Sequence, residues 1–142
     1  MDASLIERVI HLAAQIQEIP APTFHEGQRA AFVAAQFNAA GLRDVHQDEL
    51  GNVFACLPGD QGRLPLVVSA HLDSVFPAEM DLTLNRQADR LTGPGIGDNA
   101  LGLAGLFGLR WALHQQRLTL YDHFSNTLLQ NPGLAIIPLP MN

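Results

Sequence analysis

The segment Leu64–Ala70 limits the possible folds of this chain more than any other stretch. It is almost entirely apolar and shows no alternation of apolar and polar residues. A strand with one wet face alternates, whereas an unbroken apolar strand is typical of a parallel sheet covered on both faces. The sequence therefore predicts a layered α/β domain in which this strand is buried.

Helical patterns precede this strand. The first predicted helix follows a capping box that begins at Ser4, and it ends before Pro20. A second capping box at Thr23–Glu26 predicts a helix that runs to Ala40 and is terminated by the following glycine. Two helices ahead of a buried strand fit the layered arrangement.

Further elements are predicted on both sides of the apolar strand. Short strands are expected at Asp44–Gln47 and Asn52–Leu57, and a small hairpin at Leu82–Leu91. A helix from about Asn99 to Gln116 is apolar nearly all round and should be buried. Its glycines recur every three residues and would let it press closely onto a sheet; they are Gly102, Gly105 and Gly108.

Composition narrows the class of protein. The 142 residues are 47% hydrophobic and 15% charged, which is typical of one globular domain. The net charge of −6 argues against nucleic acid or an anionic membrane as partner, because phosphates require a basic surface. No apolar run is long enough to span a bilayer. The single cysteine, Cys56, indicates a reducing compartment, and we expect the cytoplasm.

His71 and Asp73 directly follow the apolar strand, and Asp98 lies in a glycine-rich turn before the last helix. In α/β sheets, ligands gather beyond the carboxyl ends of the strands. Imidazole is a common zinc ligand, and a carboxylate such as Asp73 can hold its other ring nitrogen. Asp98 can bend toward the strand ends, and a carboxylate there can bridge two metal ions.

Each of these features also has an ordinary structural interpretation. A single H-x-D triplet is more often chance than a site, and an isolated aspartate before a helix is more often an N-cap. The glycine run resembles a phosphate loop only weakly, because it lacks the following Lys-Ser/Thr. The combination of buried strand, H-x-D-S-V and G-P-G-I-G-D-N is what favours a site.

The stretches SAHLDSVFP and LTGPGIGDNALGLAGL, in this order and spacing, resemble the two N-terminal signatures of the M20 family of zinc metallopeptidases. The resemblance covers roughly Ser4 to Gln116 and implies a partial three-layer α/β/α zinc-hydrolase catalytic domain. By this resemblance His71 would ligate a metal, Asp98 would bridge two zinc ions, and Asp73 would act as the catalytic residue that orients His71. It also implies a cis peptide at Asp98–Asn99. Cobalt or manganese would suit similar ligands.

The same resemblance implies residues that the chain does not show. Family members carry a Glu-Glu pair after the bridging aspartate, as general base and metal ligand, and a final histidine ligand. This chain has no glutamate after Glu79 and no acid after Asp122. Asp122 and His123 are metal-capable, but a solvated turn is the favoured interpretation.

Two hypotheses follow from this deficit. The first is an amide or peptide hydrolase of the M20 type, acting on peptides or acylated amino acids and recorded as its N-terminal part at residues 1–117. In this hypothesis residues 118–142 form a divergent tail, after a frameshift or premature stop, that packs poorly or drapes over the open face, and the chain alone is inactive. The second is a non-catalytic α/β module that binds a protein partner through an open sheet edge.

Overall fold

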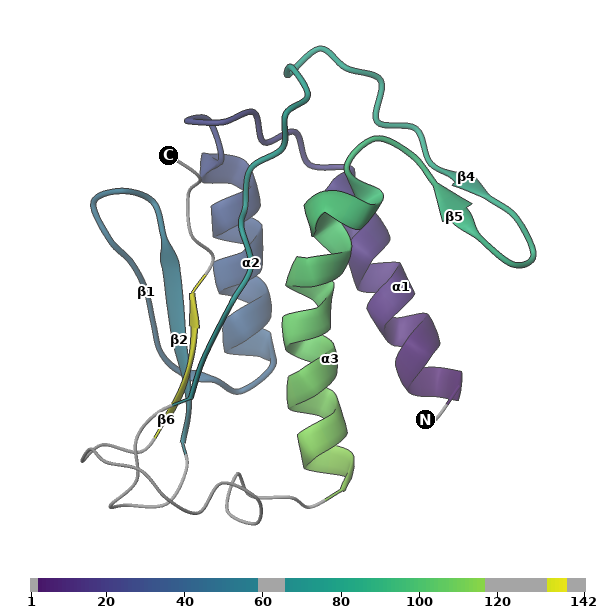
Figure 1. The fold of residues 1–142 in the computed structure, drawn as a ribbon. Coiled ribbons are helices and arrows are strands. Elements are labelled where there is room, and N and C mark those ends of the chain that lie inside the picture. Colours follow the sequence, from purple (N-terminus) through teal and green to yellow (C-terminus); the bar gives the residue numbers. More distant parts are fainter. Residues whose placement is uncertain (1–2, 59–65, 117–132, 138–142) are drawn as a thin grey trace.

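The structure is a computed structural model and describes residues 3–58, 66–116 and 133–137 (Figure 1). Its elements follow the expected order of two helices, short strands and a further helix. They are α1 (Ala3–Gln17), α2 (Gly27–Ala39), β1 (Arg43–Gln47), β2 (Val53–Pro58), β3 (Leu66–Ser69), β4 (Asn85–Arg86), β5 (Leu91–Thr92), the wide turn η1 (Ile96–Ala100), α3 (Leu101–Gln115) and β6 (Gly133–Ile137).

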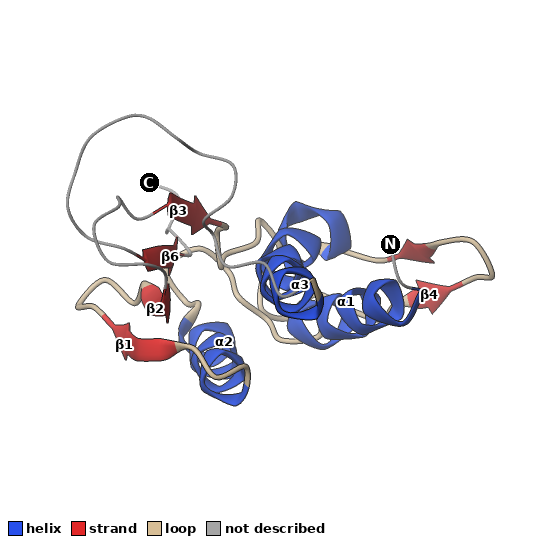
Figure 2. Ribbon diagram, turned by 90° about the horizontal axis from the view of Figure 1, so that it is seen from below, coloured by secondary structure: helices blue, strands red, loops and turns tan. Residues whose placement is uncertain are grey.

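The main sheet is mixed and has the strand order β1-β2-β6-β3. β2 runs antiparallel to both β1 and β6, whereas β3 runs parallel to β6. Helix α2 packs against β1 and β2, α3 contacts β3, and α1 packs on α3. Figure 2 shows the helices beside one face of this sheet. The α/β fold class is confirmed, and the described elements supply the sheet and one helical layer of a partial α/β/α domain.

The core forms where α2 and α3 face each other. Phe37 and Phe107 are almost completely buried, and their rings stack with centroids 4.9 Å apart. Leu12 and Ile16 of α1 and Val53 of β2 belong to the same apolar cluster. Burial of such side chains contributes about 1.5–3 kcal/mol each, so this cluster holds the helices on the sheet. No helix in the described ranges is long and apolar enough to cross a membrane.

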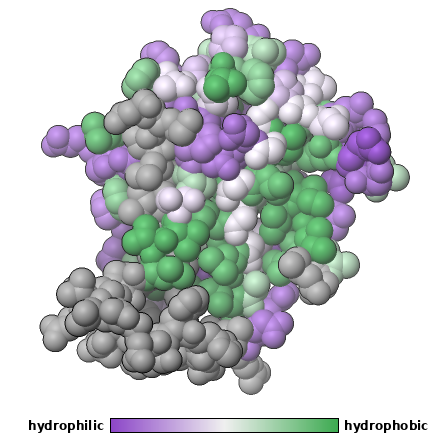
Figure 3. All heavy atoms as spheres, in the orientation of Figure 1, coloured by the Kyte–Doolittle hydropathy of each residue, from purple (hydrophilic) through white to green (hydrophobic). Residues whose placement is uncertain are grey.

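The strand that precedes His71 is less covered than predicted. β3 is parallel to its neighbour, as expected, but Leu66 and Val67 are 49% and 53% exposed. The prediction of a strand covered on both faces is therefore wrong for the described part. The reason is that β3 stands at the end of the strand order, and α3 is the helix that packs on it within the described part of the chain. The space-filling view shows apolar side chains across the middle of the face drawn (Figure 3).

The segment 133–137 contradicts the expectation of a tail that drapes over the open face. It forms β6, which lies between β2 and β3, with Ala135 opposite both Cys56 and Val67. An apolar run can complete the backbone hydrogen bonds of two neighbouring strands, and this one ends immediately before Pro138. Residues 117–132, which include Asp122 and His123, lie outside the described part, so the boundary between 1–117 and 118–142 stays a prediction.

Helix α3 is buried on one face rather than all round. Leu103 and Phe107 are buried, whereas Leu101 is 48% exposed. Its glycines do not press onto the sheet: a Cβ on Gly108 would meet Val9 of α1, and a Cβ on Gly105 would meet nothing in the described part. The close packing is between helices, because α1 covers the side of α3 that carries Gly108.

Candidate metal-binding site

The structure brings His71, Asp73 and Asp98 together at the carboxyl end of β3. The Nδ1 atom of His71 lies 3.0 Å from Oδ1 of Asp73 and 3.1 Å from the Asp73 carbonyl oxygen. Its Nε2 atom lies 2.8 Å from Oδ1 of Asp98. The Asp73 side chain is 6% exposed and that of Asp98 is 86% exposed. One carboxylate is thus a buried support for the ring, and the other faces solvent, where an ion or a substrate can reach it.

The turn before α3 places Asp98. Gly95 has φ +73°, a conformation that favours glycine, and it lies directly before η1. The buried Gln17 of α1 donates from Nε2 to the carbonyl of Pro94 at 2.7 Å, which fixes the turn to the first helix. The Asp98–Asn99 peptide is cis, as the M20 resemblance implied, and Asn99 Nδ2 donates to the His71 carbonyl at 3.3 Å. The carboxylate is therefore carried by a turn that is anchored on both sides.

Asp73 is held from the side opposite His71. Thr23 Oγ1 donates to Oδ2 of Asp73 at 2.8 Å. Arg29, which is 2% exposed, donates to the carbonyl of Leu72 at 2.8 Å and to that of Ile19 at 2.6 and 3.1 Å. Burial lowers the pKa of Arg29 to about 10, while attraction to Asp73 opposes this shift. The guanidinium therefore keeps its positive charge at neutral pH beside the buried carboxylate.

Neither Thr23 nor Arg29 was recognised as part of a site from the sequence. The predicted capping box at Thr23–Glu26 is wrong, because Glu26 is the N-cap residue of α2 and makes no side-chain cap. The Thr23 hydroxyl serves Asp73 instead. No sequence signal separates these two uses of a threonine, because the second depends on a partner 50 residues away.

The donor atoms fit a divalent ion. Two tetrahedral ligand atoms at about 2.0–2.2 Å from one ion lie roughly 3.3–3.6 Å apart. His71 Nε2 and Asp98 Oδ1 are hydrogen-bonded at 2.8 Å, so a shift of under about 1 Å would separate them to that spacing. Holding Nδ1 against a carboxylate leaves Nε2 as the metal-facing nitrogen, which is the usual arrangement of a ligand histidine. The ranges described contain no group of three His, Cys, Asp or Glu residues that could hold a metal ion. The cluster is thus a two-ligand arrangement with a supporting carboxylate.

Gly102 keeps this arrangement intact, and its replacement gives a direct test. A Cβ at Gly102 would overlap Asn99 Oδ1 and lie 2.7 Å from Asn99 Cγ. We expect Gly102→Ala to lower the free energy of unfolding by about 1–3 kcal/mol, because Asn99 must move. Gly105→Ala, the matched control, has no such neighbour among the described residues and should raise stability by up to about 1 kcal/mol, because alanine favours the helix. Urea unfolding of both variants measures the contrast, and equal effects would contradict it.

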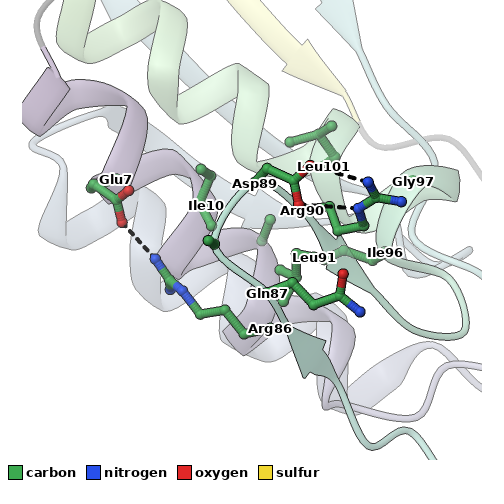
Figure 4. A pocket seen from close by; sticks show the side chains of 12 residues that line it. Glu7, Ile10, Arg86, Gln87, Asp89, Arg90, Leu91, Ile96, Gly97 and Leu101 are labelled. Atoms are coloured by element: carbon green, nitrogen blue, oxygen red, sulfur yellow. Dashed lines mark hydrogen bonds and ion pairs between the residues drawn. The ribbon is translucent and has the colours of Figure 1, made fainter.

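A pocket of about 370 Å³ lies between α1, the β4–β5 hairpin and the start of α3 (Figure 4). Its mouth carries Arg86, paired with Glu7 at 2.8 Å, and Arg90, paired with Asp89 at 3.0 Å. None of the three site residues lines it, although the neighbouring Gly97 does. Both guanidinium groups already have carboxylate partners, so we assign no ligand to this pocket.

Comparison with known proteins places the chain in a family. The model of peptidase family M28 matches residues 52–124, which is half of the chain and includes His71, Asp73 and Asp98. The chain belongs to peptidase family M28. This M28 chain is 37% identical over 106 residues to the cytosol non-specific dipeptidase of Escherichia coli (strain K12), across 64% of the chain and 22% of that protein.

Solved structures share the fold of the M28 chain. A tripeptidase of Staphylococcus aureus superposes with a TM-score of 0.71 at 20% identity, over 93% of this chain and 35% of that one. A Bacillus subtilis protein, described as a dinuclear metal-binding peptidase of the M20 family, superposes with a TM-score of 0.62 at 15% identity, over 98% of this chain and 36% of that one. The predicted resemblance to M20 peptidases is confirmed, although the matching family model is that of M28.

The chain spans about a fifth of the length of the curated dipeptidase and about a third of these solved structures. The relatives named above are peptidases, and nothing in the comparisons supports the alternative of a non-catalytic module that binds a partner through a sheet edge.

Proposed function

We propose that this chain carries part of a metal-dependent hydrolase site that acts on peptide or N-acyl amino acid bonds. His71 and Asp98 would bind a divalent ion, and Asp73 would orient His71. The observation that carries the proposal is the 2.8 Å approach of His71 Nε2 to Asp98 Oδ1, with Nδ1 held by a buried carboxylate. Membership of a peptidase family and the 37% sequence identity to a dipeptidase support hydrolysis of a peptide bond as the reaction.

Zinc is the first candidate ion, because an imidazole and a carboxylate suit it, and cobalt or manganese fit the same donors. A bound ion of this kind supplies Lewis acidity, which polarises the carbonyl of the bond to be broken. One relative is described as binding two metals, and the exposed Asp98 carboxylate is the group in this chain that would bridge them. The relative's name also supports a cytoplasmic location.

The protein residues have separate tasks in this proposal. The Asp73 carboxylate accepts the hydrogen bond from His71 Nδ1 and so keeps the ring from rotating. Asp98 presents its oxygen to the same space as Nε2. The proposal assigns no residue as general base. The 142 residues contain no glutamate after Glu79 and hence no counterpart of the Glu-Glu pair that the M20 resemblance implies.

We therefore expect the 142-residue chain to bind zinc weakly and to hydrolyse dipeptides or acylated amino acids near the background rate. Catalytic zinc usually has three protein ligands, and the described part of this chain offers two. In calorimetric titration, His71→Ala and Asp98→Ala should remove zinc binding. Asp73→Asn should weaken it by about 10–100-fold, the usual cost of losing the partner of a ligand histidine.

His114→Ala is the matched control, because that histidine is exposed near the end of α3. Its zinc affinity should equal that of the unchanged chain. Robust turnover by the 142-residue chain that depends on His71 would contradict the expected inactivity. Zinc binding that survives both ligand replacements would contradict the site.

A further inference from the structure

We propose that Thr23 is a positioning residue for His71. Through its hydrogen bond to Asp73 it fixes the carboxylate that holds the imidazole, and it thereby sets the direction of Nε2. The consequence for metal binding rests on the proposed function, whereas the effect on the imidazole does not.

Both oxygens of the Asp73 carboxylate are engaged. Oδ1 faces His71 Nδ1 at 3.0 Å, and Oδ2 accepts the hydrogen bond of Thr23 Oγ1 at 2.8 Å. Asp73 is 4% exposed, so water has little access to take the place of the hydroxyl. A buried carboxylate that loses one of two such partners can rotate or recruit the wrong donor, and the ring that it supports loses its fixed orientation.

The backbone around Thr23 is fixed independently of its side chain. Ser74 N donates to the Ala21 carbonyl at 2.7 Å, and Pro22 and Ser74 form a parallel bridge. The turn closes through His25 N, which donates to the Pro22 carbonyl at 2.8 Å. The loop between α1 and α2 is therefore attached to the chain just after Asp73, and the Thr23 hydroxyl is delivered to the carboxylate by the fold.

Arg29 and Thr23 restrain different parts of Asp73, the first its backbone and the second its side chain. The guanidinium holds the Leu72 carbonyl at 2.8 Å and so restrains the backbone directly before Asp73. Restraint of the backbone leaves the side-chain torsions of Asp73 free. Among the described residues, the hydrogen bonds that restrain those torsions are the ones to His71 and Thr23, beside the attraction to Arg29. The bond to His71 is the one that must be kept in place.

A role of Thr23 in helix formation is not needed to explain its position. Helix α2 begins at Gly27, and the Glu26 carboxylate, rather than Thr23, accepts the hydrogen bond of Phe24 N at 2.7 Å. Removing the Thr23 hydroxyl should therefore act on Asp73 and leave the start of α2 unchanged.

The test uses the metal-free 142-residue chain and three replacements of Thr23. Thr23→Val and Thr23→Ala remove the hydroxyl, and Thr23→Ser keeps it. The readout is the exchange with water of the His71 Nδ1 proton, followed by NMR and assigned by its loss in His71→Gln. This proton is donated to Asp73 both in the Nδ1-protonated neutral ring and in the imidazolium, so the readout needs neither metal nor activity.

We expect exchange of this proton to be roughly 3- to 10-fold faster in the valine and alanine variants, the loss expected for one hydrogen bond. The serine variant should stay close to the unchanged chain. Thr83→Val is the matched control, because Thr83 Oγ1 donates to Asp81 in an exposed pair of the same kind, at 2.6 Å. It should leave the His71 proton unchanged. Because Thr23 is only half-buried, the alanine variant remains usable where valine disturbs the fold.

Zinc titration is the second readout, with an affinity loss of roughly 3- to 10-fold expected for valine and alanine and none for serine. Unchanged exchange of the His71 proton in Thr23→Val and Thr23→Ala would overturn the proposal, as would failure of serine to preserve it or an equal effect of Thr83→Val. If no variant binds zinc, including the unchanged chain, the proposed function fails, and the proton measurement still decides the role of Thr23.

Discussion

His71→Ala is expected to reduce dipeptide hydrolysis to background in a chimera of this chain with its bacterial relative. In the chimera, the 106-residue stretch of the Escherichia coli cytosol non-specific dipeptidase that matches this chain is replaced by the corresponding stretch of this chain. The remainder of the chimera keeps the sequence of the relative. Loss of activity is expected because Nε2 of His71 is the nitrogen that faces Asp98.

Two further variants sharpen this experiment. Asp73→Asn should retain part of the activity, with a fall of about 10–100-fold, because it weakens the support of the ring and leaves the ligand in place. Thr83→Val should leave the rate unchanged, because that side chain is exposed and makes no contact with the cluster among the described residues. A His71→Ala chimera with more than half of the parent activity would contradict the site, and so would a folded parent chimera without activity.

Phe37→Ala is expected to lower the free energy of unfolding by about 3–5 kcal/mol. The ring of Phe37 is fully buried and stacks on Phe107 at 4.9 Å, so its removal leaves a cavity between α2 and α3. The total stability of a domain of this size is about 5–15 kcal/mol, so the loss would be a large part of it. Chemical denaturation followed by circular dichroism measures the difference.

Phe24→Ala provides the matched control, because Phe24 is 78% exposed. The same change of side chain at that position should alter the free energy of unfolding by no more than about 0.5 kcal/mol, the usual range for surface substitutions. A loss below about 1 kcal/mol for Phe37→Ala, or equal losses for the two variants, would show that the stacked pair is not the centre of the core.

The three candidate residues were predicted together because the signals for them are local. His71 and Asp73 follow an apolar run, and Asp98 stands in a glycine-rich turn that opens a helix. Side chains at strand ends and at the start of a following helix meet at one edge of an α/β sheet. The combination of these signals and the resemblance to the M20 signatures together led to the expectation that the three side chains approach one another, and the distances of 3.0 and 2.8 Å now describe that approach.

Which elements cover the strands was less predictable from the sequence than the residues of the candidate site. The sequence predicted that β3 is parallel, but its exposed side chains and the insertion of β6 beside it did not follow from its apolar pattern. An apolar run indicates that a strand favours burial, but not which elements bury it. Which element covers each face depends on the order of strands in the sheet, and that order is set by contacts between residues far apart in the chain.

The amino-acid sequence by itself determined the helices, the glycine turn, the α/β class and the residue types of the site. These depend on periodicity and turn chemistry, which act over a few residues. Only the tertiary structure decided that Thr23 serves Asp73 rather than a helix, and that a buried Arg29 lies beside the same carboxylate. The physical reason is that a hydroxyl or a guanidinium has many possible partners, and burial at a particular place in the fold selects one of them.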